Sequence, residues 1–146
     1  MESERSQYFS MICGILHLRS GEFRYVSAGH PAPAVLPRDG PPILLPSQGF
    51  PIGLIPDAEF QEETFVLSPG DRLFLYTDGF TEAANSSGQE YGAGGLLDAI
   101  EANRSLSIQS TLKHLLDNLT CWHQNSRFRD DLSMLGVEYT GDARTS

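Results

Sequence analysis

The sequence predicts an α+β domain, in which strands fill the first half of the chain and helices come before a last strand. Three observations carry this prediction. Residues 1–80 alternate between apolar runs and turn residues, as strands joined by tight turns do. The following stretch places leucines at helical spacing, and residues 132–139 return to an apolar run. This order favours a sheet with helices packed on it.

Five apolar stretches in the first half are predicted as strands. Residues 8–18 are nearly continuous in apolar character, as expected of a strand that is covered on both faces. Residues 22–28 alternate apolar and polar side chains, so these two runs are predicted to form a hairpin. Further strands are predicted over residues 34–36, 60–67 and 72–77. Prolines restrict the segments between them to loops or sheet edges, and they are Pro41, Pro42, Pro46, Pro51 and Pro56.

Two helices are predicted in the second half from the spacing of apolar residues. A short one covers residues 95–102, and a longer one begins near Ser107, whose hydroxyl is suited to cap a helix N-terminus. A polar loop at residues 127–131 then precedes the last strand. The apolar positions of the longer helix predict one buried stripe, and they are Ile108, Leu112, Leu115, Leu116, Leu119 and Trp122.

The composition is that of one folded domain with an acidic surface. Hydrophobic residues make up 40% of the 146 residues and charged residues 20%, which is ordinary for a globular protein. The net charge of −9 gives no attraction to nucleic acid or to an anionic membrane, so neither is expected as a partner. No apolar run approaches the ~20 residues of a membrane helix, and no signal peptide is recognised, so a cytoplasmic location is expected. Cys13 and Cys121 lack CxxC spacing and are expected to be small buried residues.

Acidic residues fall where two predicted strands end or begin. Asp78 directly follows the apolar strand at residues 72–77, and Asp130 and Asp131 directly precede the last strand. If the two strands are antiparallel neighbours, these carboxylates converge at one edge of the sheet. Hard divalent cations prefer oxygen ligands of this kind on rigid strands. Ordinary turns and solvated strand ends show the same spacing, so the pattern leaves metal binding and a plain turn both open.

Four motifs resemble, in chain order, those of SpoIIE-type phosphatases, which belong to the metal-dependent PPM family. They lie at residues 27–31 (SAGHP), 51–54 (PIGL), 69–83 (PGDRLFLYTDGFTEA) and 129–133 (RDDLS). The resemblance covers a domain at residues 8–139 and leaves residues 140–146 as a tail. It implies a β-sandwich flanked by helices (αββα), of which this chain holds the C-terminal two-thirds. An Asp-containing Gly-His-Gly motif that would carry the first metal-binding segment has no counterpart at residues 1–20.

The resemblance also implies a site with two Mn²⁺ or Mg²⁺ ions and a bridging water as the nucleophile. Asp78 and Asp130 match the family's metal-binding aspartates, and Asp131 is the less suited member of its pair. No catalytic side chain beyond the metal ligands is expected. Gly79 is expected at a turn, and His30 as a hydrogen-bonding residue rather than a ligand. Glu82 is expected either to contact the ligands or to be solvated at a helix start.

The activity implied is hydrolysis of phosphoserine or phosphothreonine on a regulatory protein, such as an anti-sigma-factor antagonist. A non-catalytic interaction module with the same fold stays open as an alternative, and a homodimer also stays open. A calcium-binding structural protein finds less support, because no ligand loop of about 12 residues is present. Without the bridging aspartate, this chain alone is expected to bind Mn²⁺ weakly and to hydrolyse phosphate esters poorly, if at all.

Overall fold

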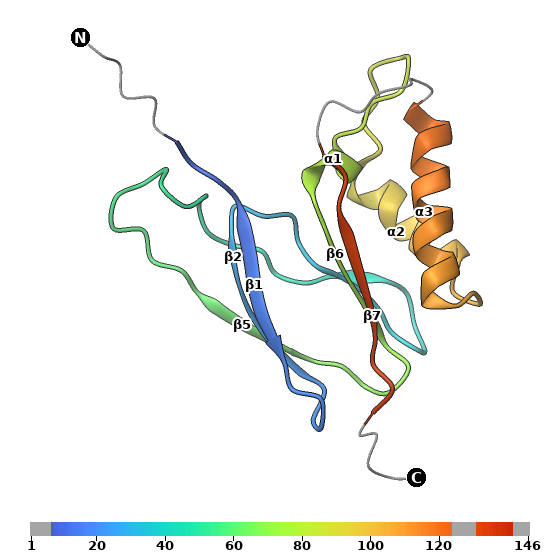
Figure 1. Ribbon diagram of the computed structural model, residues 1–146, viewed down its shortest axis with the longest axis horizontal. Helices are drawn as coiled ribbons and strands as arrows, with labels where there is room; N and C mark the ends of the chain where they lie inside the picture. The colour runs from blue at the N-terminus through green and yellow to red at the C-terminus, as the bar shows by residue number, and fades with distance from the viewer. Residues whose placement is uncertain (1–6, 124–130, 142–146) are drawn as a thin grey trace.

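The computed structural model describes residues 7–123 and 131–141, which form seven strands and three helices (Figure 1). The strands are β1 (Met11–Leu16), β2 (Glu22–Ala28), β3 (Ala34–Leu36), β4 (Ile43–Leu44), β5 (Glu62–Val66), β6 (Arg72–Tyr76) and β7 (Met134–Glu138). The helices are α1 (Asp78–Thr81), α2 (Gly92–Ala102) and α3 (Ile108–His123). Strands, then helices, then a last strand is the order that the sequence predicts, and the α+β class is confirmed.

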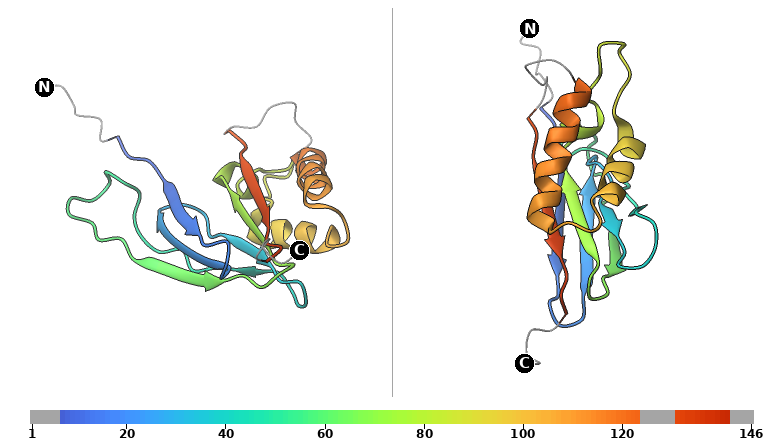
Figure 2. Two further views of the ribbon diagram at one scale, coloured as in Figure 1. Left: turned by 60° about the horizontal axis from the view of Figure 1, so that its bottom comes forward. Right: turned by 90° about the vertical axis from the view of Figure 1, so that its right-hand side faces the viewer.

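The strands form two antiparallel sheets that pack face to face. One sheet has the order β1-β2-β5 and the other the order β4-β3-β6-β7. Helices α2 and α3 cover the outer face of the four-stranded sheet (Figures 1 and 2). The layers are therefore sheet, sheet, helices, and within residues 7–123 and 131–141 no helix covers the outer face of the three-stranded sheet.

Two hydrophobic cores follow from the alternation of side chains along β6. Leu73 points into the space between the sheets, while Phe74 and Tyr76 point toward the helices. The core between the sheets contains Phe23, Tyr25, Val35, Leu45, Leu67, Leu73 and Tyr139. The core beneath the helices contains Ala34, Leu36, Phe74, Tyr76, Phe80, Ala83, Leu96, Ala99, Ile100, Leu115 and Leu119.

Helix α3 confirms most of the predicted stripe. Leu115 and Leu119 are 1% and 0% exposed, and the Ser107 hydroxyl accepts a hydrogen bond from the backbone N–H of Ser110 at 3.1 Å, as a capping residue does. Leu116 is 44% exposed, so its place in the stripe is wrong. One residue turns the helix by about 100°, which carries Leu116 away from the side that Leu115 buries. In the part of the chain that the structure describes, no helix is long and apolar enough to cross a bilayer.

Two expectations about burial are also wrong. The strand at residues 8–18 is expected to be covered on both faces, but Ile15 of β1 is 74% exposed. The reason is the bare outer face of the three-stranded sheet, where Cys13 also lies. Cys121 lies on an exposed side of α3, so both cysteines are exposed free thiols.

The short helix begins at Gly92, three residues before its predicted start at Gly95.

Two buried tyrosines fix neighbouring loops by hydrogen bonds to backbone carbonyl oxygens. The Tyr76 hydroxyl donates to the carbonyl oxygen of Ala32 at 2.6 Å, and the Tyr25 hydroxyl donates to that of Pro46 at 2.6 Å. Burial raises the pKa of Tyr76 to about 12. Burial, with a smaller contribution from Glu63, raises the pKa of Tyr25 to about 12. The fold therefore favours the protonated form of both side chains.

Because the fold favours the protonated form of Tyr25 and Tyr76, the protein is expected to lose stability in alkaline solution. Unfolded tyrosines ionise near pH 10, so the contribution of Tyr25 and Tyr76 is complete below about pH 10 and is lost as the pH rises to about 12. We expect the melting temperature to fall across this window, less steeply in Tyr76→Phe than in the parent. Circular dichroism melts at a series of pH values measure the slope. Tyr8→Phe, which alters a 59% exposed tyrosine, is the control and should leave the slope unchanged. A melting temperature that is constant from about pH 10 to about pH 12 would contradict the prediction.

Candidate metal centre

Asp78 lies where β6 ends and α1 begins. Strand β6 pairs with β7 in antiparallel register, with Tyr76 opposite Met134. The end of β6 therefore lies beside the segment that leads into β7, which carries Asp131. Asp78 and Asp131 are both exposed at this edge of the four-stranded sheet. The antiparallel pairing on which the predicted convergence depends is present.

Thr77 holds the two segments together. Its backbone N–H donates to the carbonyl oxygen of Ser133 at 3.0 Å, and its hydroxyl accepts from the Ser133 N–H at 3.1 Å. The same hydroxyl donates to the carbonyl oxygen of Asp131 at 3.1 Å. Because Thr77 directly precedes Asp78, these bonds fix the backbone next to both aspartates. Thr77 is not among the site residues that the sequence predicts, although a threonine directly before a strand-end aspartate is a signal for such a role.

Gly79 lets the two segments approach each other closely. A Cβ atom at this position would lie 2.7 Å from the carbonyl oxygen of Asp131 and 2.9 Å from Cδ2 of Leu132. Gly79 belongs to α1 and does not have a positive φ angle, so its predicted role as a turn residue is corrected. Glycine is needed here because there is no room for a side chain.

Gly79→Ala is expected to separate these segments and to lower the free energy of unfolding by about 1–3 kcal/mol, the usual cost of overpacking. Gly94→Ala is the matched control, because nothing lies within 4 Å of a Cβ atom on Gly94 in α2. That change should stabilise the protein by about 0.5–1 kcal/mol through helix propensity. Urea unfolding measures both values. Equal effects of the two substitutions would show that the contact between Gly79 and Asp131 is unimportant.

His30 and Glu82 lie on loops at the ends of their elements. The carbonyl oxygen of His30 accepts hydrogen bonds from Ser27 Oγ at 3.2 Å and from Ser47 Oγ at 2.6 Å. The His30 Nδ1 atom is buried and has no hydrogen-bond partner in the described part of the chain. Glu82 follows the last turn of α1 rather than starting a helix, and its backbone N–H donates to the Asp78 carbonyl at 2.8 Å.

The residues present fit part of a divalent-cation site. Hard cations take carboxylate oxygens together with water, and Asp78 and Asp131 offer exposed carboxylates at neighbouring strand ends. Asp130, the other predicted ligand, lies outside the described residues. Within residues 7–123 and 131–141, no three His, Cys, Asp or Glu side chains are grouped so that they could hold a metal ion.

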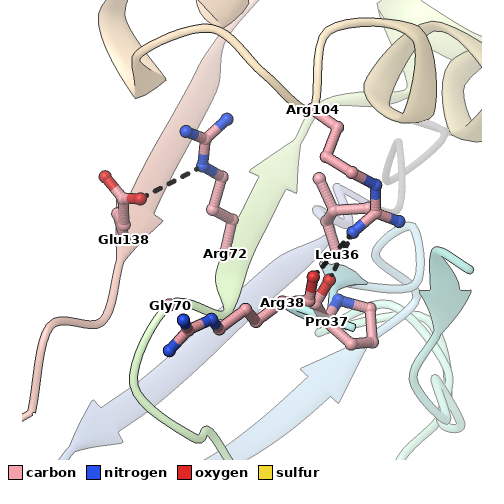
Figure 3. Close-up of a pocket in the computed structure, with 7 residues that line it drawn as sticks. All are labelled: Leu36, Pro37, Arg38, Gly70, Arg72, Arg104 and Glu138. Atoms are coloured by element: carbon pink, nitrogen blue, oxygen red, sulfur yellow. Dashed lines mark hydrogen bonds and ion pairs between the residues drawn. The ribbon is translucent and has the colours of Figure 1, made fainter. Parts of the chain in front are cut away.

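A cavity of about 120 Å³ lies at the opposite end of β6 from Asp78 (Figure 3). Three arginines among its walls raise the question of an anion site. Arg72 is buried, its Nε lies 3.5 Å from Glu138, and its two terminal nitrogens donate to Thr111 Oγ1 and to the Leu106 carbonyl. The lining residues are Leu36, Pro37, Arg38, Gly70, Arg72, Arg104 and Glu138.

The guanidinium group of Arg104 makes five hydrogen bonds within the chain. It donates to the carbonyl oxygens of Pro37, Arg38 and Gly40, and makes two further bonds to the Glu101 carboxylate. An arginine side chain has five N–H donors, so none is left for a ligand. Arg72 and Arg104 therefore have a structural role: they tie the helical layer to the sheet and to the loop after β3.

The sandwich and its helical layer give the fold that solved phosphatase domains of the SpoIIE and RsbU kind share. The structure matches that of the RsbU and RsbW domains of Rv1364c from Mycobacterium tuberculosis with a TM-score of 0.74 and 26% identity, over 90% of this chain and 37% of that chain. It also matches the manganese-presoaked phosphatase domain of SpoIIE from Bacillus subtilis with a TM-score of 0.73, over 94% of this chain and 58% of that chain. The second match has 14% identity and shows the fold alone.

Residues 1–140 match the family described as Stage II sporulation protein E (SpoIIE), and the chain belongs to this family. Among curated proteins, it is 26% identical over 133 residues to the phosphoserine phosphatase RsbU of Bacillus subtilis, which covers 90% of this chain and 39% of that protein. The chain spans 39% or less of the length of the curated relatives it matches. The resemblance to SpoIIE-type phosphatases that the four motifs predict is confirmed.

Proposed function

We propose that residues 8–139 carry part of a metal-dependent phosphatase domain that acts on phosphoserine or phosphothreonine, with residues 140–146 as a tail. The β6–β7 pairing carries this proposal, because it brings the Asp78 and Asp131 segments to one sheet edge in a chain of the SpoIIE family. The similarity to RsbU of Bacillus subtilis, a phosphoserine phosphatase, supports the reaction class.

The aspartates of this edge would hold Mn²⁺ or Mg²⁺ through carboxylate oxygens, with Asp78 and Asp130 as the main ligands and Asp131 beside them. Bound divalent cations would lower the pKa of a water molecule and offset the charge of the phosphoryl oxygens. Within the described residues, no side chain or backbone group hydrogen-bonds the Asp78 carboxylate, which leaves its oxygens available. Thr77 and Gly79 would keep the ligand segments at a fixed separation.

The substrate class follows from the relatives. The matched Mycobacterium tuberculosis structure joins an RsbU domain and an RsbW domain in one protein. We propose a phosphorylated regulatory protein as the substrate of this chain, with an anti-sigma-factor antagonist as the expected class. The exposed position of Asp78 and Asp131 suits a protein substrate, since a phosphoserine on a protein surface must reach the carboxylates without entering a deep cavity.

A non-catalytic interaction module is the second candidate. A fold that keeps its sheets and loses metal ligands could still bind a phosphoprotein without hydrolysing it.

Manganese-dependent release of phosphate from a phosphoserine peptide separates the two candidates. It is measured for the 146-residue chain and, where the reading frame continues upstream of Met1, for the chain extended by that segment, which we call the lengthened chain. We expect slow turnover by the 146-residue chain and fast turnover by the lengthened chain, abolished by a chelator and restored by Mn²⁺. Inactivity of both, with folded protein in each case, would favour the interaction module.

A further inference from the structure

His30 differs from two other histidines of the chain in what its ring does. His17 Nδ1 lies 3.1 Å from Ser20 Oγ, and His123 Nδ1 lies 2.8 Å from the carbonyl oxygen of Ala84. The Nδ1 atom of His30 is buried, and in the described part of the chain neither ring nitrogen of His30 has a hydrogen-bond partner. A buried polar atom without a partner is rare in folded proteins, so this ring nitrogen needs an explanation.

The fold holds His30 by its backbone and not by its ring. The His30 carbonyl oxygen accepts hydrogen bonds from the hydroxyl groups of Ser27 and Ser47, whose oxygens lie 2.8 Å apart. Gly29 has a φ angle of 66° and lies so close to Pro51 that a Cβ atom on Gly29 would lie 2.5 Å from Pro51 Cγ. The backbone is therefore fixed on both sides of this point, and the imidazole ring is left for another use.

The loop that carries His30 lies at the same end of the sandwich as Asp78. It joins β2 of the three-stranded sheet to β3 of the four-stranded sheet, so it crosses from one sheet to the other. Strand β3 runs antiparallel to β6, which places the start of β3 beside the end of β6. The hydrogen bond from the Tyr76 hydroxyl to the Ala32 carbonyl joins the end of β6 to this loop. The proposed metal site and the His30 loop therefore share one end of the fold.

The burial of Nδ1 decides which ring nitrogen of a neutral His30 carries the proton. A neutral imidazole has one N–H donor and one acceptor nitrogen. Because a buried N–H without an acceptor is rarer than an unpaired buried acceptor, the proton belongs on Nε2. His30 is only partly buried, and Nε2 is the ring nitrogen that a ligand can reach. His30 thus presents a hydrogen-bond donor at the end of the sandwich that carries Asp78.

We propose that His30 binds the phosphoryl group of the substrate, with its Nε2–H donating a hydrogen bond to a phosphoryl oxygen. The inference rests on the proposed function and names a side chain that holds its substrate. Ionised carboxylates such as those of Asp78 and Asp131 offer no donor, so donors to the phosphoryl oxygens come from other parts of the site. A hydrogen bond to an anionic oxygen is among the stronger ones in proteins. The fixed loop would present this donor in one position.

Binding of a phosphoserine peptide to the 146-residue chain in the presence of Mg²⁺ tests this contact. We expect the dissociation constant to rise about 10-fold or more in His30→Ala, because a hydrogen bond to a charged group is lost. His30→Gln should restore most of the affinity, since its side-chain amide offers an N–H donor near the place of Nε2. His114→Ala, which alters an exposed histidine on α3, is the control and should leave the affinity unchanged.

The histidine ring itself gives a second readout that needs no catalysis. Long-range ¹H–¹⁵N spectra at about pH 8, where an ordinary histidine is neutral, show which ring nitrogen carries the proton. We expect the proton of His30 on Nε2, and we expect the Nε2 signal to shift when the phosphoserine peptide is added. The unphosphorylated peptide should cause no such shift.

Three results would overturn the inference. One is equal affinity of the parent and His30→Ala for the phosphoserine peptide, which would leave the proposed function standing. Another is a similar loss of affinity and of melting temperature in His30→Ala and His30→Gln, which would give His30 a structural role. The third is a parent chain that does not bind the peptide. By contrast, a chain that binds the peptide through His30 and releases no phosphate would contradict the proposed hydrolysis and support this inference.

Discussion

Asp78→Asn is expected to lower manganese-dependent phosphate release by the lengthened chain about 100-fold or more, since loss of groups that merely support a metal ligand already costs 10- to 100-fold. The substitution keeps the size of the side chain and removes its negative charge, so the cation loses an anionic ligand while the fold is kept. Because the Asp78 carboxylate is exposed, the melting temperature should change by no more than about 2 °C.

Asp117→Asn is the control for this experiment, because Asp117 is an exposed aspartate on α3 and takes no part in the proposed site. It should leave both phosphate release and the melting temperature unchanged. Binding of Mn²⁺ to the 146-residue chain, followed by water-proton relaxation, gives a readout without catalysis, and Asp78→Asn should weaken it about tenfold or more. If Asp78→Asn retained half of the parent's turnover, Asp78 would not be a metal ligand.

Leu115→Ala is expected to lower the free energy of unfolding by about 2–5 kcal/mol, the range for deleting a large buried aliphatic side chain. Leu115 is 1% exposed and lies in the core beneath the helices, together with Ile100 and Leu119. The fold gives little room for the surroundings to collapse, because β6 and α2 both line this core.

The neighbouring residue supplies a matched control. Leu116→Ala removes the same atoms from a side chain that is 44% exposed, so the cost should stay below about 1 kcal/mol. Urea unfolding of the two variants beside the parent measures the difference. Similar costs for both would mean that α3 presents a different face to the sheet from the one described.

The order of elements and the convergence of the Asp78 and Asp131 segments could be predicted because both depend on local patterns. Apolar runs of strand length mark β6 and β7, and antiparallel pairing of neighbours then brings the end of one beside the start of the other. The four motifs added the class of protein. The position of Asp130, on which the predicted pair of main ligands depends, stays a prediction.

Such patterns do not predict which face of β1 is buried or which contacts form at the site. A continuous apolar run does not tell which of its faces meets a partner, so Cys13 and Ile15 were expected inside and lie outside. Helical spacing marks the centre of a buried stripe but not its width, which explains Leu116. The bond from Thr77 to Asp131 joins residues distant in sequence, and the close approach at Gly79 appears only once the backbone path is known.

The pairing of β6 with β7 also bears on how the protein is made. Strand β6 leaves the ribosome well before β7, because α2 and α3 lie between them in the sequence. Until β7 follows, the nascent chain exposes the edge of β6 and the part of α3 that packs on β7 to other molecules in the cell. Pairings between distant segments form slowly, so this interval is when a chaperone would be most needed.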